Sequence, residues 1–402
     1  MQKRFNVTGT CIPEKHYMVD ISNKLDSILK LVNNEEYFII NRPRQYGKTT
    51  TLYLLEKRLN RMEEYLPIKI SFEAIDTEGY SEVKKFLSSI MMQIVNYFRF
   101  STNKEIYKFV KNHEHKITTM NEFNSFITDL IEFAEKKVVL IIDEVDKSSS
   151  NQLFLDFLGM LRSKYLLRNE GRDYTFHSVI LAGVHDVKQA SQIYDFDMIA
   201  YSCEEMSRRF LTKDLKIRAD EEHKYNSPWN IASDFDVEMS FSISEIKTML
   251  DDYVKNKAVD LNKEYFAEKL YFYTSGYPFL VSKLCKIIDE KIMNGNELKW
   301  EKEYLELAVK ELLNESNTNF DSLIKNIENN KELSELVRKI ILDRYEITYN
   351  QHNPPITMGI IYGIFKNSNG KVKIHNRIYE QRIYNYISSL IETKVNLSFY
   401  YV

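Results

Sequence analysis

The sequence predicts an α/β protein over about its first 240 residues, followed by a helical region and a mixed C-terminal region. Short apolar runs alternate with segments whose apolar residues recur at helical spacing. This alternation is typical of a parallel sheet covered by helices on both faces. It stops near residue 235, where helical patterns follow one another. At 402 residues the chain is long enough for two or three domains.

Four apolar runs predict the strands of the sheet. The run at 137–143 has apolar residues on both faces, as a strand buried inside a parallel sheet does. Between the runs, apolar residues recur every three to four positions, which predicts helices. The predicted strands are 36–41, 67–72, 137–143 and 176–183, and the predicted helices are 48–59, 81–100, 120–134 and 152–167.

The second half of the chain predicts five helices and a hairpin. The first helix has Ser244 as its expected N-cap, and the hairpin turns at 367–370. A β-hairpin behind helices indicates a winged-helix-like α+β module. We therefore expect three domains, at 1–240, 241–316 and 317–402. The predicted helices are 244–253, 261–273, 278–292, 301–314 and 331–342, and the predicted strands are 359–365 and 371–374.

Charge and cysteine usage exclude several classes of protein. The net charge of −3 gives no general attraction to nucleic acid or to anionic lipid. Cys11, Cys203 and Cys285 lie far apart, which argues against a disulfide framework and a zinc site, and for a reducing compartment. Neither a secretory signal nor an apolar run of about 18 residues occurs. We expect a cytoplasmic protein without membrane association.

Residues 42–49, Arg-Pro-Arg-Gln-Tyr-Gly-Lys-Thr, match the second half of the phosphate-loop pattern G-x-x-x-x-G-K-[ST]. Gly47 lets backbone amides point inward, Lys48 reaches the β- and γ-phosphates, and the Thr49 hydroxyl ligates Mg²⁺. The strand before the loop and the helix after it supply the context that the motif requires. Arg42 replaces the first glycine, so a chance Gly-Lys-Thr in a surface turn is the alternative. The expected nucleotide contacts are Arg44, Gln45, Tyr46, Gly47, Lys48, Thr49 and Thr50.

The strand at 137–143 ends in two carboxylates, Asp143 and Glu144. This is the Walker B pattern: the apolar run is buried in the sheet, and the acids emerge at its carboxyl end. Asp143 would hold the magnesium, together with Thr49, and Glu144 would polarise the attacking water. We take Glu144 and Lys48 as the catalytic residues. An acidic turn after an ordinary buried strand is the alternative, but the two motifs together predict a P-loop nucleotide site.

The fourth apolar strand, at 176–183, is followed by His185 and Asp186. A residue that senses the γ-phosphate usually stands at the end of such a strand, so either side chain is a candidate. A turn residue with satisfied hydrogen bonds explains each of them equally well.

The sequence resembles the AAA-like ATPases of the STAND and origin-recognition branch of P-loop proteins, over about residues 5 to 390. The resemblance implies that 241–316 is a helical lid and that Gly276-Tyr277-Pro278 is the G-x-P element through which the lid touches the nucleotide. Pro278 is therefore a further candidate contact, although a plain helix start is the alternative. The matching segments are 16–20, 41–50, 141–145, 226–232 and 273–281.

The expected arginines of such a site are not all present. No arginine stands in the lid helix after Pro278, which puts a sensor-2 arginine in doubt, and 189–213 resembles an insertion. The candidates for an arginine finger are Arg162, Arg208, Arg209 and Arg218.

Basic and aromatic residues alternate in the tail at 373–386. Arg377 and Arg382 beside tyrosines are compatible with nucleic-acid binding. Tyr379 and Ile383, however, begin an apolar face at helical spacing, which favours packing in the core.

The sequence thus predicts an ATP-binding, Mg²⁺-dependent ATPase that acts as a nucleotide-dependent switch. Hydrolysis is expected to be slow or stimulated by a partner, because no obvious arginine stands in cis to neutralise the transition state. ATP and ADP are the expected ligands; a homo-oligomer or a protein partner stays open, and nucleic acid is weakly supported. The alternatives are a nucleotide-gated binding module that does not hydrolyse ATP and a DNA-binding regulator.

Overall fold

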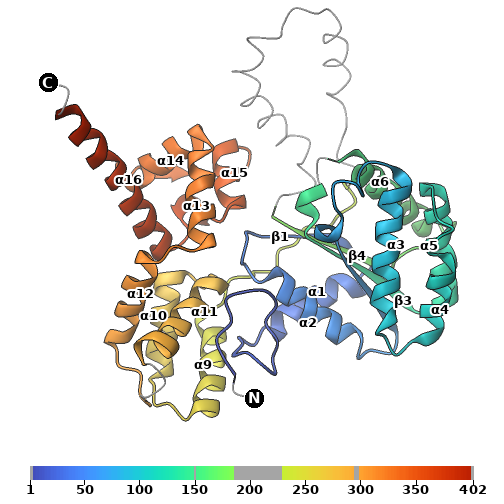
Figure 1. Cartoon of the computed structure of the whole chain (residues 1–402), viewed down its shortest axis with the longest axis horizontal. Coiled ribbons are helices and arrows are strands. Elements are labelled where there is room, and N and C mark those ends of the chain that lie inside the picture. Colours follow the sequence, from blue (N-terminus) through green and yellow to red (C-terminus); the bar gives the residue numbers. More distant parts are fainter. Residues whose placement is uncertain (1–2, 149–150, 185–228, 294–297, 400–402) are drawn as a thin grey trace, which may run out of the picture. The chain divides into compact units, whose positions relative to one another are not determined.

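The computed structural model describes residues 3–148, 151–184, 229–293 and 298–399. Within these ranges the chain forms two compact units, each assembled from separate stretches of sequence (Figure 1). The sheet unit comprises 25–41 and 52–237, and the helical unit comprises 1–24, 42–51 and 238–402. None of the helices in the described part of the chain is long and apolar enough to cross a membrane.

Four parallel strands form the centre of the sheet unit. They are β1 (Tyr37–Asn41), β2 (Tyr65–Ser71), β3 (Lys137–Asp143) and β4 (Ser178–Gly183), in the spatial order β1-β4-β3-β2. Nearly every strand residue is buried, as expected when helices cover both faces of a sheet. The predicted α/β class, a parallel sheet covered by helices, is confirmed.

The helices of the sheet unit follow the strands in the predicted alternation. Thr119 caps α5 in a capping box with Glu122, and Asn103 caps α4. Two short 3₁₀ turns follow β2 and β3. The bounds are α1 (Ser22–Asn33), α2 (Lys48–Leu59), α3 (Val83–Arg99), α4 (Lys104–His113), α5 (Met120–Ala134), α6 (Gln152–Asn169), η1 (Phe72–Ala74) and η2 (Val145–Ser148).

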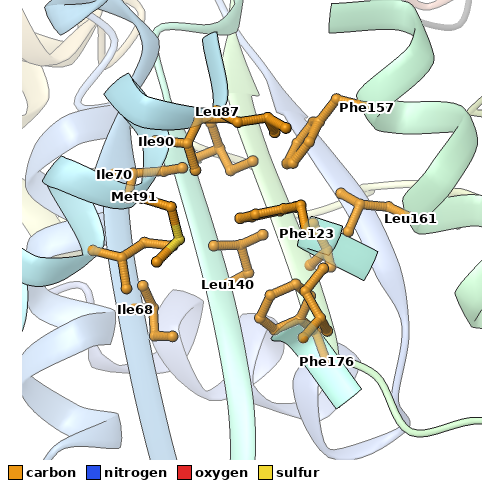
Figure 2. Close-up of a cluster of buried hydrophobic side chains, with 14 of the residues drawn as sticks. Ile68, Ile70, Leu87, Ile90, Met91, Phe123, Leu140, Phe157, Leu161 and Phe176 are labelled. Carbon is orange, nitrogen blue, oxygen red and sulfur yellow. The ribbon is translucent and has the colours of Figure 1, made fainter. Parts of the chain in front are cut away.

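One large apolar core holds β2, β3 and three helices together (Figure 2). Ile68 of β2 lies opposite Leu140 of β3, so both side chains project from the same face of the sheet. Burying a side chain of this size stabilises the fold by about 1.5–3 kcal/mol. The helix side chains drawn against this face are Leu87, Ile90 and Met91 of α3, Phe123 of α5, and Phe157 and Leu161 of α6. The core therefore holds these strands and helices together.

The helical unit contains helices and one small antiparallel sheet. A π-helical turn, Ile288–Ile292, continues α11. The sheet has the order β5-β7-β6. The bounds are α9 (Ile243–Lys257), α10 (Lys263–Thr274), α11 (Pro278–Ile287), α12 (Glu303–Asn314), α13 (Thr318–Glu328), α14 (Lys331–Ile341), β5 (Ile347–Thr348), α15 (Pro354–Ile361), β6 (Phe365–Ser368), β7 (Lys371–Ile374) and α16 (Arg377–Phe399).

Two local predictions in this unit were wrong. The N-cap of α9 is Ser242 and not Ser244: Ser242 accepts from the amide of Glu245, which bonds back to close a capping box. The run from 359 to 361 is helical and not a strand, because Pro354 starts α15 at a position that suits proline. The first hairpin strand begins only at Phe365.

The hairpin turn itself is where the sequence predicts it. Ser368 pairs with Lys371, so Asn369 and Gly370 form a two-residue loop between β6 and β7. Both have positive φ, 52° and 75°. An Asn-Gly pair suits such a turn because neither residue is strongly strained there.

The N-terminal segment packs on α9 within the helical unit. Arg4 forms a backbone bridge with His16, which closes the segment into a loop. The rings of Phe5 and Tyr17 each lie about 5 Å from Tyr253, at 5.0 and 5.1 Å between centroids. Buried aromatic pairs of this kind add stability beyond their area, so the segment is an integral part of the unit.

Candidate functional site

The phosphate loop joins the end of β1 to the start of α2, which begins at Lys48. Gly47 has φ +83°, and Gln45 is also left-handed with φ +57°. A side chain at position 47 would be strained whatever space surrounds it, which explains the glycine. The amide of Thr51 donates to the Gly47 carbonyl at 2.9 Å, so the loop leads directly into the first helical turn.

Lys48 is held inside this loop. Its side chain is buried, at 6% exposure, and Nζ donates to the carbonyls of Arg42 at 2.7 Å and Pro43 at 3.0 Å. Thr50 accepts a hydrogen bond from the Cys11 amide at 3.0 Å. The ammonium group thus lies beside a helix N-terminus, and both favour an anion.

The side chain of Tyr46 contacts residues of the helical unit. Its ring is buried, and its hydroxyl hydrogen-bonds with Ser240 and, at 3.0 Å, with Nε2 of His375. The hydroxyl of Tyr277 donates to the Arg44 carbonyl at 2.5 Å. The polar end of Tyr46, predicted as a nucleotide contact, is therefore engaged with the body of the helical unit, whereas Arg44 and Gln45 are exposed.

The Gly276-Tyr277-Pro278 segment lies next to the loop. A Cβ on Gly47 would meet Cγ of Pro278 at 3.9 Å, so the two residues are close neighbours. Gly276 has φ +73°, and a Cβ there would be 2.0 Å from the Phe241 carbonyl oxygen. Only glycine allows this close passage. Pro278 then starts α11, so the tripeptide is a helix entry placed against the phosphate loop.

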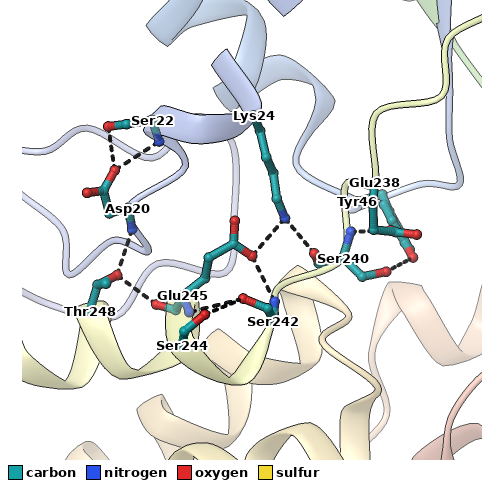
Figure 3. A network of polar contacts seen from close by, with 10 residues as sticks. All are labelled: Asp20, Ser22, Lys24, Tyr46, Glu238, Ser240, Ser242, Ser244, Glu245 and Thr248. Atoms are coloured by element: carbon teal, nitrogen blue, oxygen red, sulfur yellow. Dashed lines mark hydrogen bonds and ion pairs between the residues drawn. The ribbon is translucent and has the colours of Figure 1, made fainter. Parts of the chain in front are cut away.

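A polar network fixes the surroundings of Tyr46 (Figure 3). Lys24 donates to the Ser240 carbonyl at 2.5 Å and pairs with Glu245 at 2.9 Å. The Ser240 amide in turn donates to Glu238 at 2.7 Å. These bonds hold both backbone groups of Ser240, and so place the hydroxyl that meets Tyr46.

The acidic strand end belongs to the sheet unit. Asp143 is buried, at 4% exposure, and its Oδ1 accepts the amide of Glu144 at 3.0 Å. Glu144 has φ +55°, a conformation that costs a non-glycine residue energy and occurs often at functional sites. Asn41, the last residue of β1, pairs with Gly183 of β4. The carboxyl ends of parallel strands lie at one edge of a sheet. Asp143 therefore lies at the same edge as Asn41, the residue that the phosphate loop follows.

Asp146 is a residue of this edge that the sequence reasoning missed. Its two carboxylate oxygens accept from the single amide of Val184, at 2.6 and 2.7 Å. A Cβ on Gly183 would lie 2.6 Å from Oδ1, so the glycine permits the approach. The third acid in Asp-Glu-Val-Asp was the available signal. The sensor candidates His185 and Asp186, which come next, lie outside the described residues.

The candidate arginines divide into two groups. Arg162 donates from Nε to Asn230 at 2.8 Å, whereas Arg208, Arg209 and Arg218 lie outside the described residues. The structure therefore leaves the choice of an arginine finger as a prediction.

The arginines of the tail have structural partners. Arg382 donates to the Leu313 carbonyl at 2.6 Å and lies over the ring of Phe320, and Arg377 lies 4.0 Å from the ring centre of Phe272. On the apolar face that begins with Tyr379, the side chains of Tyr379, Ile383 and Ile387 are buried. This confirms core packing as the role of that face of α16.

Comparisons with known proteins show similarity in sequence and in fold. Residues 19–193 match the family model described as AAA-like domain. The structure is similar to a Walker-type ATPase of Pyrococcus abyssi, with a TM-score of 0.54, 15% identity, and coverage of 94% of this chain and 99% of that chain. At this identity the similarity shows a shared fold.

Two further solved structures are similar at lower scores. The ORC2 protein of Aeropyrum pernix in ADPNP-ADP complexes has a TM-score of 0.46 and 12% identity, with 97% of each chain covered. Cdc6p from Pyrobaculum aerophilum has a TM-score of 0.41 and 12% identity, covering 96% of this chain and 97% of that chain. The comparison with curated protein sequences gives no match. The resemblance stated from the sequence is confirmed over 19–193, which supports an ATP-binding P-loop protein.

Proposed function

Since residues 19–193 match the model of the AAA-like domain, we propose that the protein binds ATP with Mg²⁺ at the phosphate loop and acts as a nucleotide-dependent switch. The observation that carries the proposal is the loop itself: a left-handed Gly47 followed by a buried Lys48 at the start of a helix. Backbone amides, an ammonium group and a helix N-terminus together suit the β- and γ-phosphates.

The proposed roles follow from the donor groups. Lys48 neutralises phosphate charge, and the Thr49 hydroxyl and the Asp143 carboxylate hold Mg²⁺. These hard oxygen donors fit a cation that keeps several waters and takes its remaining ligands from phosphate. The residues proposed to line the nucleotide are Arg44, Gln45, Tyr46, Gly47, Lys48, Thr49, Thr50 and Pro278.

Hydrolysis is proposed to depend on Glu144, which would polarise the water that attacks the γ-phosphate and gives ADP and phosphate. Its position directly after the buried Asp143 supports this role. We expect slow turnover, or turnover that a partner stimulates.

Phosphate release by the wild type and by Glu144→Gln tests this step. The substitution keeps the size of the side chain and removes the base, so turnover should fall by about 10²-fold or more while ATP still binds. Release by the wild type that does not exceed background would reject the ATPase and leave a nucleotide-gated binding module that does not turn ATP over. Equal release above background from both proteins would reject the role of Glu144 alone.

We propose three domains: a nucleotide domain at 1–240, a STAND-type helical lid at 241–316 and a winged-helix-like domain at 317–402. The neighbouring positions of Gly47 and Pro278 support a lid that reaches the nucleotide. The Asn-Gly hairpin behind α13–α15 supports the winged-helix-like assignment. A homo-oligomer or protein partner, and a cytoplasmic location, stay predictions.

The base is proposed to be adenine. Residues 23–26, Asn-Lys-Leu-Asp, match the guanine-recognition pattern Asn-Lys-x-Asp. The charged side chains of this segment, however, form ion pairs with other residues. Lys24 pairs with Glu245, and Asp26 pairs with Arg58 at 2.5 Å. Competition binding should therefore favour ATP over GTP; a preference for GTP would refute this assignment.

One observation favours DNA binding as a second function. Lys366 of β6 lies directly opposite Lys373 of β7, and like charges opposite each other destabilise a sheet. Burial, with a smaller contribution from Lys373, lowers the pKa of Lys366. A phosphate backbone would relieve this repulsion. Salt-dependent binding of duplex DNA that Lys373→Gln weakens would support this function, and binding unchanged by the substitution would oppose it.

A further inference from the structure

We infer that His375 is a positioning residue for the phosphate loop: through Tyr46 it fixes the shape of the loop and thereby ties nucleotide affinity to the C-terminal sheet and α16. This inference rests on the proposed binding of ATP at the loop. His375 itself is not proposed to touch the nucleotide.

Three rings and one hydrogen bond make the contact. Nε2 of His375 and the hydroxyl of Tyr46 are 3.0 Å apart, and their rings meet edge to face at 5.8 Å. The ring of Tyr277 completes the cluster, 4.8 Å from Tyr46 and 5.3 Å from His375. Tyr277 also donates its hydroxyl to the Arg44 carbonyl. Each member is buried, so a change in one ring requires the others to move.

The backbone of the C-terminal region holds His375 in place. The amide of His375 donates to the Ile364 carbonyl at 2.8 Å, directly after β7 ends. The next residue, Asn376, accepts the amide of Tyr379 at 2.9 Å in the first turn of α16. Because the sheet and the helix fix both sides of His375, its ring position is a property of the whole C-terminal region.

A second, separate contact reaches the loop from the same region. Gly363 lies against Pro43, so closely that a Cβ on the glycine would be 2.8 Å from Cβ of Pro43. Its φ of +72° also excludes most side chains. Residues 363–375 therefore meet the loop at Pro43 and at Tyr46, on the chain just before Gly47 and Lys48. A loop fixed at these two points presents its amides in one arrangement.

The chemistry of the pair explains why its loss should matter. Burial lowers the pKa of His375 to about 4, so the imidazole is neutral at physiological pH. A neutral imidazole and a phenol share one proton between them as a hydrogen bond. Removing the imidazole leaves a buried hydroxyl with fewer partners and frees the ring of Tyr46 to move.

The test measures the dissociation constant of a fluorescent ATP analogue for the full-length protein. His375→Ala and Tyr46→Phe should each weaken binding about three- to tenfold, the effect of losing one buried hydrogen bond. The double variant should be little weaker than either single one, because both remove the same interaction. His375→Gln, which keeps a polar atom near Nε2, should recover part of the affinity. Tyr386→Phe is the matched control. It removes a hydroxyl that contacts Glu328 in the same region, and its affinity for the ATP analogue should equal that of the wild type.

Lys48→Ala separates failure of the inference from failure of the proposed function. If Lys48→Ala binds as the wild type does, the loop is not the ATP site and the proposed function fails. If Lys48→Ala abolishes binding while His375→Ala keeps wild-type affinity, the inference about His375 alone is overturned.

Hydrogen exchange on the wild type keeps the inference testable even if His375→Ala does not fold. Coupling is reciprocal, so adding ATP should slow amide exchange at 371–379 in the wild type and leave it unchanged in Lys48→Ala. Exchange at 371–379 that ATP does not alter in the wild type would overturn the inference.

Discussion

Both carboxylate oxygens of Asp146 accept a hydrogen bond from one backbone amide, that of Val184. It thereby joins the turn after β3, which carries Glu144, to the end of β4. Charge-assisted hydrogen bonds of this kind are among the stronger ones in proteins. We interpret Asp146 as a residue that sets the geometry of the acidic edge without taking part in the reaction.

Replacing Asp146 should therefore affect turnover more than binding. Asp146→Ala should lower the rate of phosphate release at saturating ATP about ten- to hundredfold, since a displacement of about 1 Å can cost a hundredfold in rate, with little change in ATP affinity. Asp146→Asn keeps a carbonyl acceptor for the Val184 amide and should recover part of the rate. Equal losses in both variants, or a loss of affinity alone, would argue against a positioning role.

His375 also makes a prediction about pH. Burial lowers its pKa to about 4 from an ordinary value near 6.5. The unfolded chain then binds a proton before the folded protein does, so stability is full above pH 6.5 and is lost as the pH falls toward 4. Between pH 7 and pH 5, the free energy of unfolding of the helical unit, measured with denaturant, should fall by about 2 kcal/mol more in the wild type than in His375→Gln. Parallel pH profiles for the two proteins would contradict this.

Helices and strands were predicted best where the apolar residues of a segment follow a single period. The bounds of α2, α5 and β3 agree with those in the structure. The run at 359–361 was misassigned because a short apolar segment has the same pattern in a helix and in a strand. The helix α13 was not predicted, since only a few apolar side chains stand among polar ones along its length.

The site was predictable only as far as its chemistry lies in contiguous sequence. The residue pattern of the loop predicts Lys48 as a site residue, and the acidic strand end predicts Asp143. The contact between Tyr46 and His375 spans 329 positions, and no local pattern encodes it. The same holds for the amide that Asp146 accepts, because that bond depends on the order of the strands.

The start of α9 gives a prediction with a built-in control. Ser242→Ala removes the N-cap and half of the capping box, which costs about 1 kcal/mol. Amide exchange in the first turn of α9 should accelerate roughly fivefold. Ser244→Ala, two residues later and inside the helix, should change it little. The opposite ranking would restore Ser244 as the cap.

At the scale of the whole molecule, the two compact units do not follow the order of the chain. The phosphate loop belongs to the helical unit, although the strand before it and most of the helix after it belong to the sheet unit. Partners of the loop such as Pro278 and His375 come from the second half of the chain. Nucleotide binding is therefore expected to depend on both halves.

A fragment ending at residue 240 tests this dependence. It keeps the loop and the acidic strand but lacks Tyr277, Pro278 and His375. We expect it to bind ATP at least tenfold more weakly than the full chain, because several buried loop contacts are lost together. Circular dichroism shows whether the fragment folds. A folded fragment with the affinity of the full chain would show that the loop needs nothing from 241–402.

ATP is proposed to bind at the phosphate loop through Lys48. Titration calorimetry of full-length protein with ATP and Mg²⁺, for the wild type and for Lys48→Ala, tests it most directly. We expect one ATP per chain for the wild type and at least a hundredfold loss of affinity in Lys48→Ala, because a buried charge that pairs with phosphate is removed. Equal affinities for the two proteins, or no binding to the wild type, would contradict it.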